Sequence, residues 1–544
     1  MSFSENDELA CLPYAVGHGE EGVCLLIRMG RHRILLDCGL TDIAPLIANP
    51  FPPADLVLCS HAHRDHAQGL LALHQAFPKL PIYASEVTTQ LLPLTWPNLP
   101  SADIPNFCHA LPWRSPIELQ DGLCVELFPS GHLPGAAAFH LTYTAAKRSY
   151  TLFYTGDFFL SNSRLVEGLP LEGLRGLEPD VLIVEGSYGT ARHPHRRQQE
   201  NQLVESIHQA IAQQQSVILP VPTLGLGQEI LMLLRSHHLF TGRDLDIWVD
   251  GNVAAGCDAY LEILPHLPTS VQNFARHQPL FWDERVRPRV RRLQPSQRSL
   301  VGRSTCIVLT DENQDLNEYW QAGNSWVLLL PQQSGRPNTI ESRNANLDSS
   351  ARSRRQFKPY ITQHYLLAEH SDGLGTAQLI HNLRPQHALF FHSSPLYLAD
   401  LTGLEELQNR YHLHSPAAGT LVELPIGETF IQPAAPETSY EGELTELETV
   451  VAIALPDAIA ADPRWQKFAD TGLVEARWQG EELVLRGLSQ KELLNQIEDA
   501  RSSITVDCCG ICRHQRGQRC WNQASPLYEF KVTPDGHCPA FESI

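Results

Sequence analysis

Short apolar runs alternate with longer segments of helical periodicity, and no other feature of this chain constrains its fold as strongly. Runs such as 22–29, 151–154 and 181–184 have the length of buried strands, whereas 196–212 has a helical period. Strands that alternate with helices predict layered α/β domains. At 544 residues the chain is too long for one compact core, so several domains are expected.

Neither apolar runs nor cysteines suggest a membrane or secreted protein. No apolar run approaches the roughly 20 residues that a membrane-spanning helix needs, and the first residues lack a basic stretch followed by an apolar one. Eight of the 13 cysteines are scattered singly over the first 306 residues. Such scatter is typical of buried free thiols in a reducing compartment, so we expect a cytoplasmic protein without membrane contact.

The charge is acidic overall but unevenly distributed. The formal net charge of -20 argues, taken alone, against a polyanionic partner. Between positions 276 and 303, however, eight arginines occur with only two acids, and 352–358 is a second basic run. Conversely, 431–462 has seven acids and no lysine or arginine. Because a polyanion binds in one groove, the local sign of the charge matters more than the total.

Metal-capable side chains gather where apolar runs end. Four of them occupy six positions directly after the run 56–59: His61, His63, Asp65 and His66. Imidazole and carboxylate groups are ligands that suit zinc and similar divalent ions. Three more each lie at or just after an apolar run: His132, Asp157 and His392. Seven ligand-type side chains at strand ends predict a dinuclear metal site.

The motifs around these side chains resemble those of the metallo-β-lactamase fold. "SHAHRDH" (60–66) is similar to the signature of that fold, and "GHLPGAA" (131–137) and "YTGD" (154–157) are similar to its next two motifs, in the expected order. "LLDCG" (35–39) resembles the early aspartate motif, which implies that Asp37 organises the loops of the site.

Four further motifs resemble the β-CASP branch of that fold, which processes nucleic acids. They are "DVLIVEGSYGT" (180–190), "LPVPTLGLGQEILMLL" (219–234), "AEHSDGLGTAQLI" (368–380) and "ALFFHSS" (388–394). The resemblance is greatest to the RNA-cleaving members, such as the endonuclease that processes messenger-RNA 3′ ends and ribonuclease J. Two departures from their pattern are Leu226, where those members have an arginine, and the sequence "HSSP" after the last apolar run.

The resemblance spans about 1–430 and implies a metallo-β-lactamase αββα sandwich with an inserted α/β β-CASP domain. By position, the sandwich consists of 1–204 and 359–430, and the insert of 205–358. An acidic linker and a small mixed module then occupy 431–500. A small cysteine-rich tail, 501–544, completes the expected organisation.

The resemblance also implies roles for the site residues. It implies two Zn²⁺ or Mn²⁺ ions, one held by His61, His63 and His132, the other by Asp65, His66 and His392, with Asp157 bridging them. His370 matches the histidine that protonates the leaving oxygen, and Glu185 matches the carboxylate that orients it. A metal-dependent ribonuclease is therefore expected. The alternatives are hydrolysis of a small thioester, lactone or phosphodiester, and a non-catalytic RNA-binding subunit.

The basic stretch inside the insert is a candidate RNA contact. Four of its arginines are predicted to lie along the phosphate backbone: Arg287, Arg289, Arg291 and Arg292. The alternative is a solvated face, or a subunit contact such as that of a homodimer.

The tail contains a second metal pattern, C-x2-C-x7-C-x17-C. Its members are Cys509, Cys512, Cys520 and Cys538. Four thiolates in a segment too short to build its own core predict a structural zinc site. An iron–sulfur cluster uses the same ligands and stays open as an alternative.

Overall fold

A computed structural model describes residues 9–18, 21–146, 148–320, 325–332 and 360–427, and the segments 444–447, 450–453, 474–479, 482–487, 512–516 and 519–520. The chain forms two compact units, 1–436 and 437–544. In the second unit the described strands form three antiparallel pairs: β21 (Leu444–Leu447) with β22 (Val450–Ile453), β23 (Val474–Gln479) with β24 (Glu482–Gly487), and β25 (Gln515–Arg516) with β26 (Arg519–Cys520).

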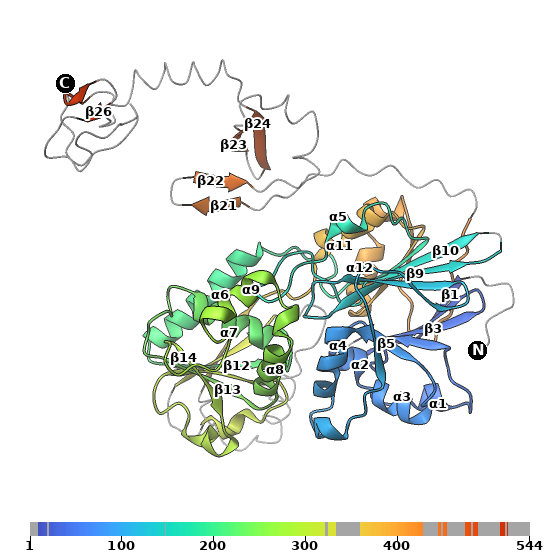
Figure 1. Ribbon diagram of the computed structural model, residues 1–544, viewed down its shortest axis with the longest axis horizontal. Helices are drawn as coiled ribbons and strands as arrows, with labels where there is room; N and C mark the ends of the chain where they lie inside the picture. Colours follow the sequence, from blue (N-terminus) through green and yellow to red (C-terminus); the bar gives the residue numbers. More distant parts are fainter. Residues whose placement is uncertain are drawn as a thin grey trace. The chain divides into compact units, whose positions relative to one another are not determined.

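Two seven-stranded sheets form the two-sheet body of the first unit (Figure 1). The first has the order β20-β1-β2-β3-β4-β5-β6, with strands Val422–Glu423, Leu9–Val16, Val23–Met29, His32–Leu36, Leu56–Leu58, Ile82–Ser85 and Cys108–Leu111. The second has the order β19-β18-β11-β10-β9-β8-β7, with strands His412–His414, His387–Phe391, Val181–Glu185, Ser149–Tyr154, Ala137–Thr144, Leu123–Pro129 and Ile117–Gln120.

Strand β11 shows why the layers stack. Val181 and Ile183 pack into the core between the two sheets, whereas Leu182 and Val184 pack into a separate core beneath helices. Because successive side chains of a strand point to opposite faces, an unbroken apolar run requires an apolar layer on each side. The mixed α/β architecture expected from the sequence is confirmed.

Helices cover the outer face of each sheet. On the first sheet these are α1 (Ala44–Ile47), α2 (Arg64–Ala67), α3 (Leu70–Ala76) and α4 (Glu86–Leu91). On the second they are α5 (Leu171–Leu174), α11 (Gly373–Leu383), α12 (Pro395–Thr402) and α13 (Glu405–Gln408). Among the described residues, no helix combines the length and apolar character that crossing a membrane requires.

The start of α12 explains the unusual "HSSP" sequence. Ser394 is the N-cap, with its Oγ accepting a hydrogen bond from the amide of Tyr397, and Pro395 occupies the first helical position. Serine and proline are favoured at these two positions. Strand β18 therefore ends at Phe391 and the helix starts at Pro395, which holds His392 at the junction.

A third sheet, here called the insert together with its helices, lies between β11 and β18 in the chain. Its order is β14-β13-β15-β12-β16-β17, with strands Arg289–Leu293, Asp246–Asp250, Cys306–Asp311, Ser216–Val221, Trp326–Pro331 and Tyr360–Tyr365, and all pairs are parallel. One face packs against α6 (Arg196–Ala212), α7 (Leu226–Ser236), α8 (Gly251–Glu262) and α9 (Thr269–His277). Figure 1 shows the insert in green, beside the two-sheet body.

The insert has different limits from those expected. Helix α6, divided by the expected boundary at 204/205, packs through Leu203, Val204 and Ile207 in the same core as β12. Strand β17, expected to belong to the return segment 359–430, pairs in parallel with β16. Apolar packing and backbone pairing thus join both elements to the third sheet, which moves the boundaries to the start of α6 and the end of β17.

Candidate metal centre

The seven candidate ligands lie where strands of the two-sheet body end: His61, His63, Asp65 and His66 after β4, His132 after β8, Asp157 after β10 and His392 after β18. Strand β9 is antiparallel to both β8 and β10, whereas β10, β11 and β18 are parallel. Strands β8, β10, β11 and β18 therefore run in one direction. Their carboxyl ends meet at one edge of the second sheet, which gathers their side chains.

Asp157 lies at the centre of this cluster, and its two oxygens face different histidines. Oδ2 is 3.5 Å from Nε2 of His61 and 3.8 Å from Nε2 of His132. Oδ1 is 3.3 Å from Nε2 of His66 and 3.3 Å from Nδ1 of His392. Ligand atoms about 2.0–2.2 Å from one tetrahedral ion lie roughly 3.3–3.6 Å apart. The observed separations are close to that range.

The atoms that could hold a cation form three overlapping groups, one of which joins Asp157 and His392 to Glu185 and His370. His61, His63, His132 and Asp157 offer atoms that all lie within 4.8 Å of one another. Asp65, His66 and His392 form a second group by the same measure.

Three buried atoms of the cluster have no hydrogen-bond partner among the described residues: Nε2 of His61, Nε2 of His66 and Oδ1 of Asp157. Burying a polar atom without a partner is costly, so such atoms require an explanation. All three belong to nitrogen and oxygen ligands of the kind that divalent cations bind. The donor set therefore fits divalent cations.

Asp37 fixes the orientation of His66. Its Oδ2 accepts a hydrogen bond from Nδ1 of His66 at 2.7 Å, which leaves Nε2 facing Asp157. The same carboxylate accepts hydrogen bonds from the amide and hydroxyl of Ser60 and from the hydroxyl of Tyr154. A carboxylate that orients a histidine in this way is a common partner of metal-ligating histidines.

Two ligands are oriented by carbonyls from the insert and from the segment that follows it. Nε2 of His63 lies 3.3 Å from the carbonyl of Leu224, between β12 and α7. Nδ1 of His132 lies 2.9 Å from the carbonyl of Glu369, after β17. When each of these nitrogens donates to its carbonyl, the other nitrogen of the ring remains an acceptor for a cation. The two acceptor nitrogens lie 3.0 Å apart.

His370 and Glu185 form a buried pair beside the cluster. Nδ1 of His370 is 2.9 Å from Oε1 of Glu185, which also accepts a hydrogen bond from the amide of Phe158. The other carboxylate oxygen accepts a hydrogen bond from the hydroxyl of Ser187, which in turn contacts His392 at 2.9 Å. The rings of His370 and His132 have centroids 4.6 Å apart, so the pair adjoins the ligand cluster.

Burial and charge set the protonation of these groups. Burial lowers the pKa of His61 and His63, and that of His132 to about 3, so these imidazoles are in the neutral form that binds metal. Burial lowers the pKa of His370, but the charges of Glu185 and Asp157 outweigh it and raise this pKa to about 9. Burial raises the pKa of Glu185, but the charge on His370 lowers it to about 2. Without cations, this pair is ionised at neutral pH.

A cavity of about 570 Å³ opens in front of the cluster, lined by residues of the two-sheet body and of the insert. From the body it is lined by candidate ligands, His370 and the stretch 94–98. From the insert, Thr223, Asn252 and Asp311 line it at or just beyond the carboxyl ends of β12, β13 and β15. This is the edge of a parallel sheet at which ligands usually bind.

The four candidate RNA-binding arginines lie on β14 or just before it, and none lines the cavity. Arg289 contacts Asp244 and Asp246 at 2.6 Å each, and Arg292 contacts Asp258 at 2.5 Å. Arg287 and Arg291 also lie within 4.0 Å of carboxylates, at 3.7 Å from Asp244 and 3.5 Å from Glu284. Each guanidinium thus already faces an acid.

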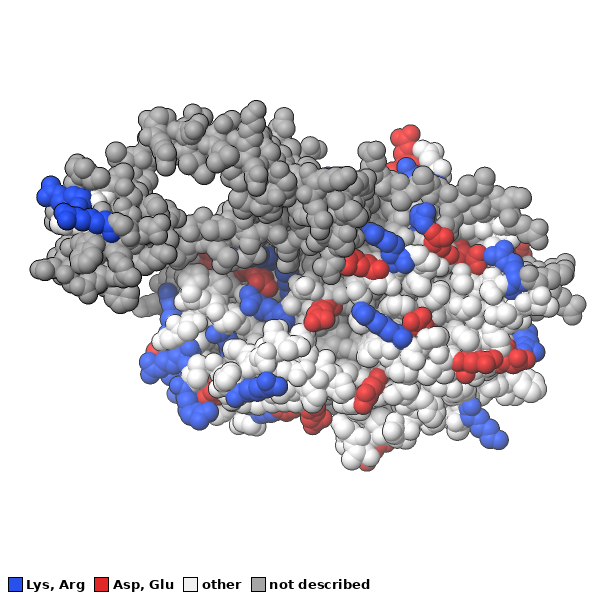
Figure 2. All heavy atoms as spheres, turned by 45° about the horizontal axis from the view of Figure 1, so that its top comes forward, with Lys and Arg blue, Asp and Glu red and all other residues white. Residues whose placement is uncertain are grey.

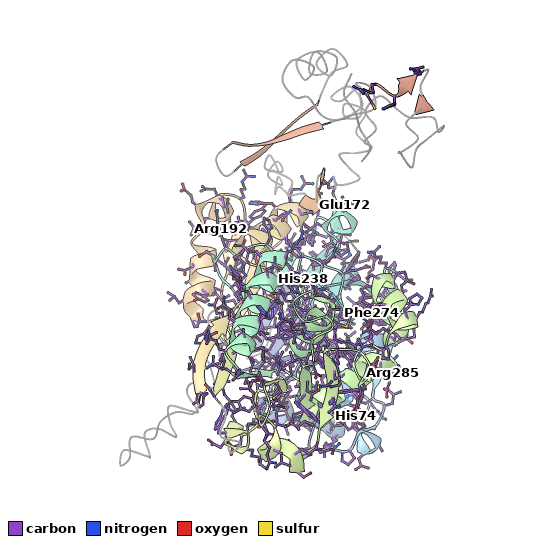
Figure 3. All side chains as sticks on the ribbon, turned by 90° about the vertical axis from the view of Figure 1, so that its left-hand side faces the viewer. His74, Glu172, Arg192, His238, Phe274 and Arg285 are labelled. Atoms are coloured by element: carbon purple, nitrogen blue, oxygen red, sulfur yellow. The ribbon has the colours of Figure 1, made fainter. Side chains whose placement is uncertain are left out.

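The wider surface is also mixed in charge. Figure 2 shows basic and acidic side chains interspersed over the described part of the face it displays. Arg285, labelled in Figure 3, belongs to the same stretch of the insert, and its side chain is 84% exposed.

Two of the four tail cysteines fall in described segments. Cys512 is a buried free thiol three residues before β25, and Cys520 is the last residue of β26. Cys509 and Cys538 lie outside the described residues. The tail site stays a prediction.

Five groups that position the site were not predicted: the side chains of Ser60, Tyr154 and Ser187, and the carbonyls of Leu224 and Glu369. Ser60 and Ser187 lie one and two residues from predicted site residues, which is a usable signal. Tyr154 belongs to an apolar run, and Leu224 contributes only its backbone, so neither carries a local signal.

Comparisons with known proteins agree with this geometry. The sequence pattern described as "Beta-lactamase superfamily domain" matches residues 32–218. The chain is 50% identical over 549 residues to "Uncharacterized protein sll0514" of Synechocystis sp., an alignment that covers 98% of this chain and 97% of the relative.

Two relatives of Methanocaldococcus jannaschii match part of the chain. "Probable RNase MJ4" is 30% identical over 247 residues, which cover 42% of this chain and 56% of that protein. "RNase J-like protein" is 28% identical over 303 residues, which cover 53% of this chain and 67% of that protein.

Proposed function

Because this chain belongs to the metallo-β-lactamase β-CASP family and is therefore a hydrolase, we propose that it is a ribonuclease that hydrolyses RNA phosphodiester bonds at two divalent cations. The names of the two relatives from Methanocaldococcus jannaschii support RNA as the substrate. In this proposal the third sheet and its helices are the β-CASP insert.

The observation that carries the proposal is the position of Asp157. One oxygen faces His61 and His132 and the other faces His66 and His392, at 3.3–3.8 Å. Such a carboxylate can bridge two cations. The preference of imidazole-rich sites favours Zn²⁺, with Mn²⁺ as the alternative.

Divalent cations at this centre supply Lewis-acid polarisation of the phosphate and lower the pKa of a water nucleophile. The protein supplies the proton that the departing oxygen needs. His370 donates from Nδ1 to Glu185, so Nε2 is the nitrogen from which it can release a proton. Glu185, with a pKa of about 2, stays ionised and keeps the imidazole oriented and charged.

The completeness of the site separates this proposal from its alternatives. A non-catalytic RNA-binding subunit would not need buried ligand atoms that lack partners, such as Nε2 of His61 and Nε2 of His66. Hydrolysis of a small thioester would not need a charged imidazole paired with a carboxylate, because a thiolate leaves more readily than a ribose oxygen. Comparison substrates in the test below separate the lactone and the small phosphodiester.

The test is cleavage of a 5′-labelled RNA by the purified protein, with and without a chelator. We expect cleavage that the chelator abolishes and Zn²⁺ or Mn²⁺ restores, and two metal equivalents bound by the first unit. His370→Ala should lower the rate by about 10²- to 10⁴-fold, the usual contribution of a general acid. A small phosphodiester, a lactone and a single-stranded DNA of the same sequence serve as comparison substrates. Cleavage that persists in chelator, or full activity of His370→Ala, would reject the mechanism.

The cellular compartment and the metal of the tail belong to the same proposal. The described cysteines are free, which supports a reducing compartment such as the cytoplasm. In the tail, we retain a structural Zn²⁺ held by Cys509, Cys512, Cys520 and Cys538, with an iron–sulfur cluster as the alternative. A brown colour and visible absorption of the purified protein would reject zinc there.

A further inference from the structure

Both walls of the cavity carry carboxylates, and the body wall also carries an arginine. Arg64 is the only lysine or arginine among the described residues that line it. From the insert, the wall carries Asp311 and Glu312 together with neutral polar groups. Asp65, Asp157 and Glu369 line the cavity from the body. A polyanion that enters it therefore meets carboxylates on both walls, with the Arg64 guanidinium and the charged imidazole of His370 on the body wall.

Arg64 lies between two candidate ligands in the sequence but has no hydrogen bond or ion pair with either side chain. It is the residue between His63 and Asp65, and it begins the short helix α2. Its side chain is exposed, and no hydrogen bond, ion pair or aromatic contact of its guanidinium occurs with the described residues. This contrasts with the arginines of β14, each of which faces a carboxylate.

A neutral donor lies on the same wall. Asn98 lines the cavity, and its side-chain amide likewise has no hydrogen bond with the described residues. The segment before it is held against α2: Thr95 donates to the carbonyl of Ala62 at 3.0 Å, and Trp96 donates to the carbonyl of Gln68 at 2.9 Å. A guanidinium and an amide are thus presented together beside the ligand cluster.

We propose that Arg64, assisted by Asn98, forms a phosphate subsite that binds a phosphodiester group of the substrate next to the one being cleaved. This inference rests on the proposed ribonuclease function and assigns the substrate a direction across the cavity. Phosphate lies toward the body, and ribose hydroxyls and bases lie toward the carboxylates and amides of the insert. A guanidinium suits this role because its planar fork can donate two parallel hydrogen bonds to a phosphate.

Two physical arguments separate this assignment from a solvated surface charge. The first is placement: Arg64 lies between the candidate ligands His63 and Asp65 and lines the cavity, where its charge offsets the carboxylates of Asp311 and Glu312 for an entering phosphate. In addition, a phosphate held at a neighbouring position contributes equally to substrate and transition state. Its loss should therefore raise KM and leave kcat almost unchanged.

The experiment compares wild-type protein with Arg64→Gln, Arg64→Lys and Arg303→Ala on a labelled single-stranded RNA over a range of salt concentrations. Arg303 is the matched control, because it is exposed, lies before the amino end of β15 and does not line the cavity. KM, kcat and bound metal are measured for each protein.

We expect Arg64→Gln to raise KM about tenfold at low salt, with kcat and metal content unchanged. The slope of log(kcat/KM) against log[salt] should flatten by about 0.7, the value for one phosphate contact with a single strand. Arg64→Lys should recover the salt slope but only part of the affinity, since it keeps the charge and loses the fork. Arg303→Ala should match the wild type.

Three results would overturn the subsite: an unchanged KM and salt slope in Arg64→Gln, a loss confined to kcat or accompanied by loss of metal, or an equal loss in Arg303→Ala. Each of these leaves the ribonuclease function standing, because the wild type still cleaves RNA. A metal-loaded wild type that does not cleave RNA rejects that function, and the subsite with it.

Discussion

Replacing Glu185 by glutamine should move the alkaline limb of the pH–rate profile. The carboxylate is buried, with 1% of its side chain exposed, and lies 2.9 Å from Nδ1 of His370. A hydrogen bond to a charged partner contributes about 1.5–3 kcal/mol, and each unit of pKa corresponds to about 1.36 kcal/mol. Loss of the carboxylate charge should therefore lower the pKa of His370 by roughly one to two units.

The sign follows from the role of His370 as a proton donor. Activity requires the protonated ring and is lost as the pH rises through its pKa, so Glu185→Gln should lose activity at a lower pH than the wild type. Bound cations lower the pKa of His370 in both proteins, so the difference between them is the quantity to measure. The assay is kcat on labelled RNA between pH 6 and about 10, with bound metal determined for each variant.

Ser187→Ala is the matched control for this experiment. It removes a hydrogen bond to the same carboxylate and a contact with His392 but leaves the negative charge in place, so the two variants are compared at equal metal content. We expect its alkaline limb to stay near that of the wild type. An unmoved limb in Glu185→Gln with full metal content would refute the assignment of His370 as the proton donor oriented by Glu185.

Three further predictions test the surroundings of the site. Asp37→Asn should weaken metal retention by about 10- to 100-fold in a competition with a chelator, because it removes the carboxylate that orients a ligand. Gly17→Ala should lower metal content and activity, since its Cβ would lie 2.8 Å from Cα of His392, whereas Gly242→Ala, with a similar positive φ and no atom within 4 Å, should retain both. Replacing four arginines by serine should weaken RNA binding and flatten its salt dependence in a binding titration: Arg287, Arg289, Arg291 and Arg292. The effect should be smaller than that of removing four unpaired cations, because each guanidinium already faces an acid. An unchanged slope would exclude these side chains from the RNA interface.

The composition of the candidate site was predictable because its signals are local. His61 to His66 are dense within one motif, and each of the more distant candidates directly follows an apolar run. Strands that run in the same direction present their carboxyl ends at one edge, so residues at strand ends tend to meet. The structure brings these side chains together, although Asp65 and His392 are 327 positions apart.

The partners of those side chains were less predictable, because they depend on packing between distant segments. Tyr154 reaches Asp37 across 117 positions, and nothing in its own run distinguishes it from an apolar strand residue. The pairing of the insert's arginines depends on strand register: Arg289 lies opposite Asp246 because β14 pairs with β13 in parallel. The number of arginines in the sequence does not predict which carboxylate each one faces.

The limits of the insert depend on pairing between distant segments in the same way. The expected boundary at 358/359 follows the end of a basic run, but β17 is assigned by its hydrogen bonds to β16. Sequence pattern identifies a strand, whereas membership of a sheet is decided by which neighbour it pairs with.

The carbonyls of Leu224 and Glu369 have a consequence for how the enzyme is assembled. The first lies in the insert and the second in the segment that returns from it to the body, and they hold the rings of His63 and His132. Docking of the insert and cation loading are therefore thermodynamically linked: whatever strengthens one strengthens the other by the same factor. Removing the ions should weaken the docking of the insert on the body, and weakening that docking should release the ions.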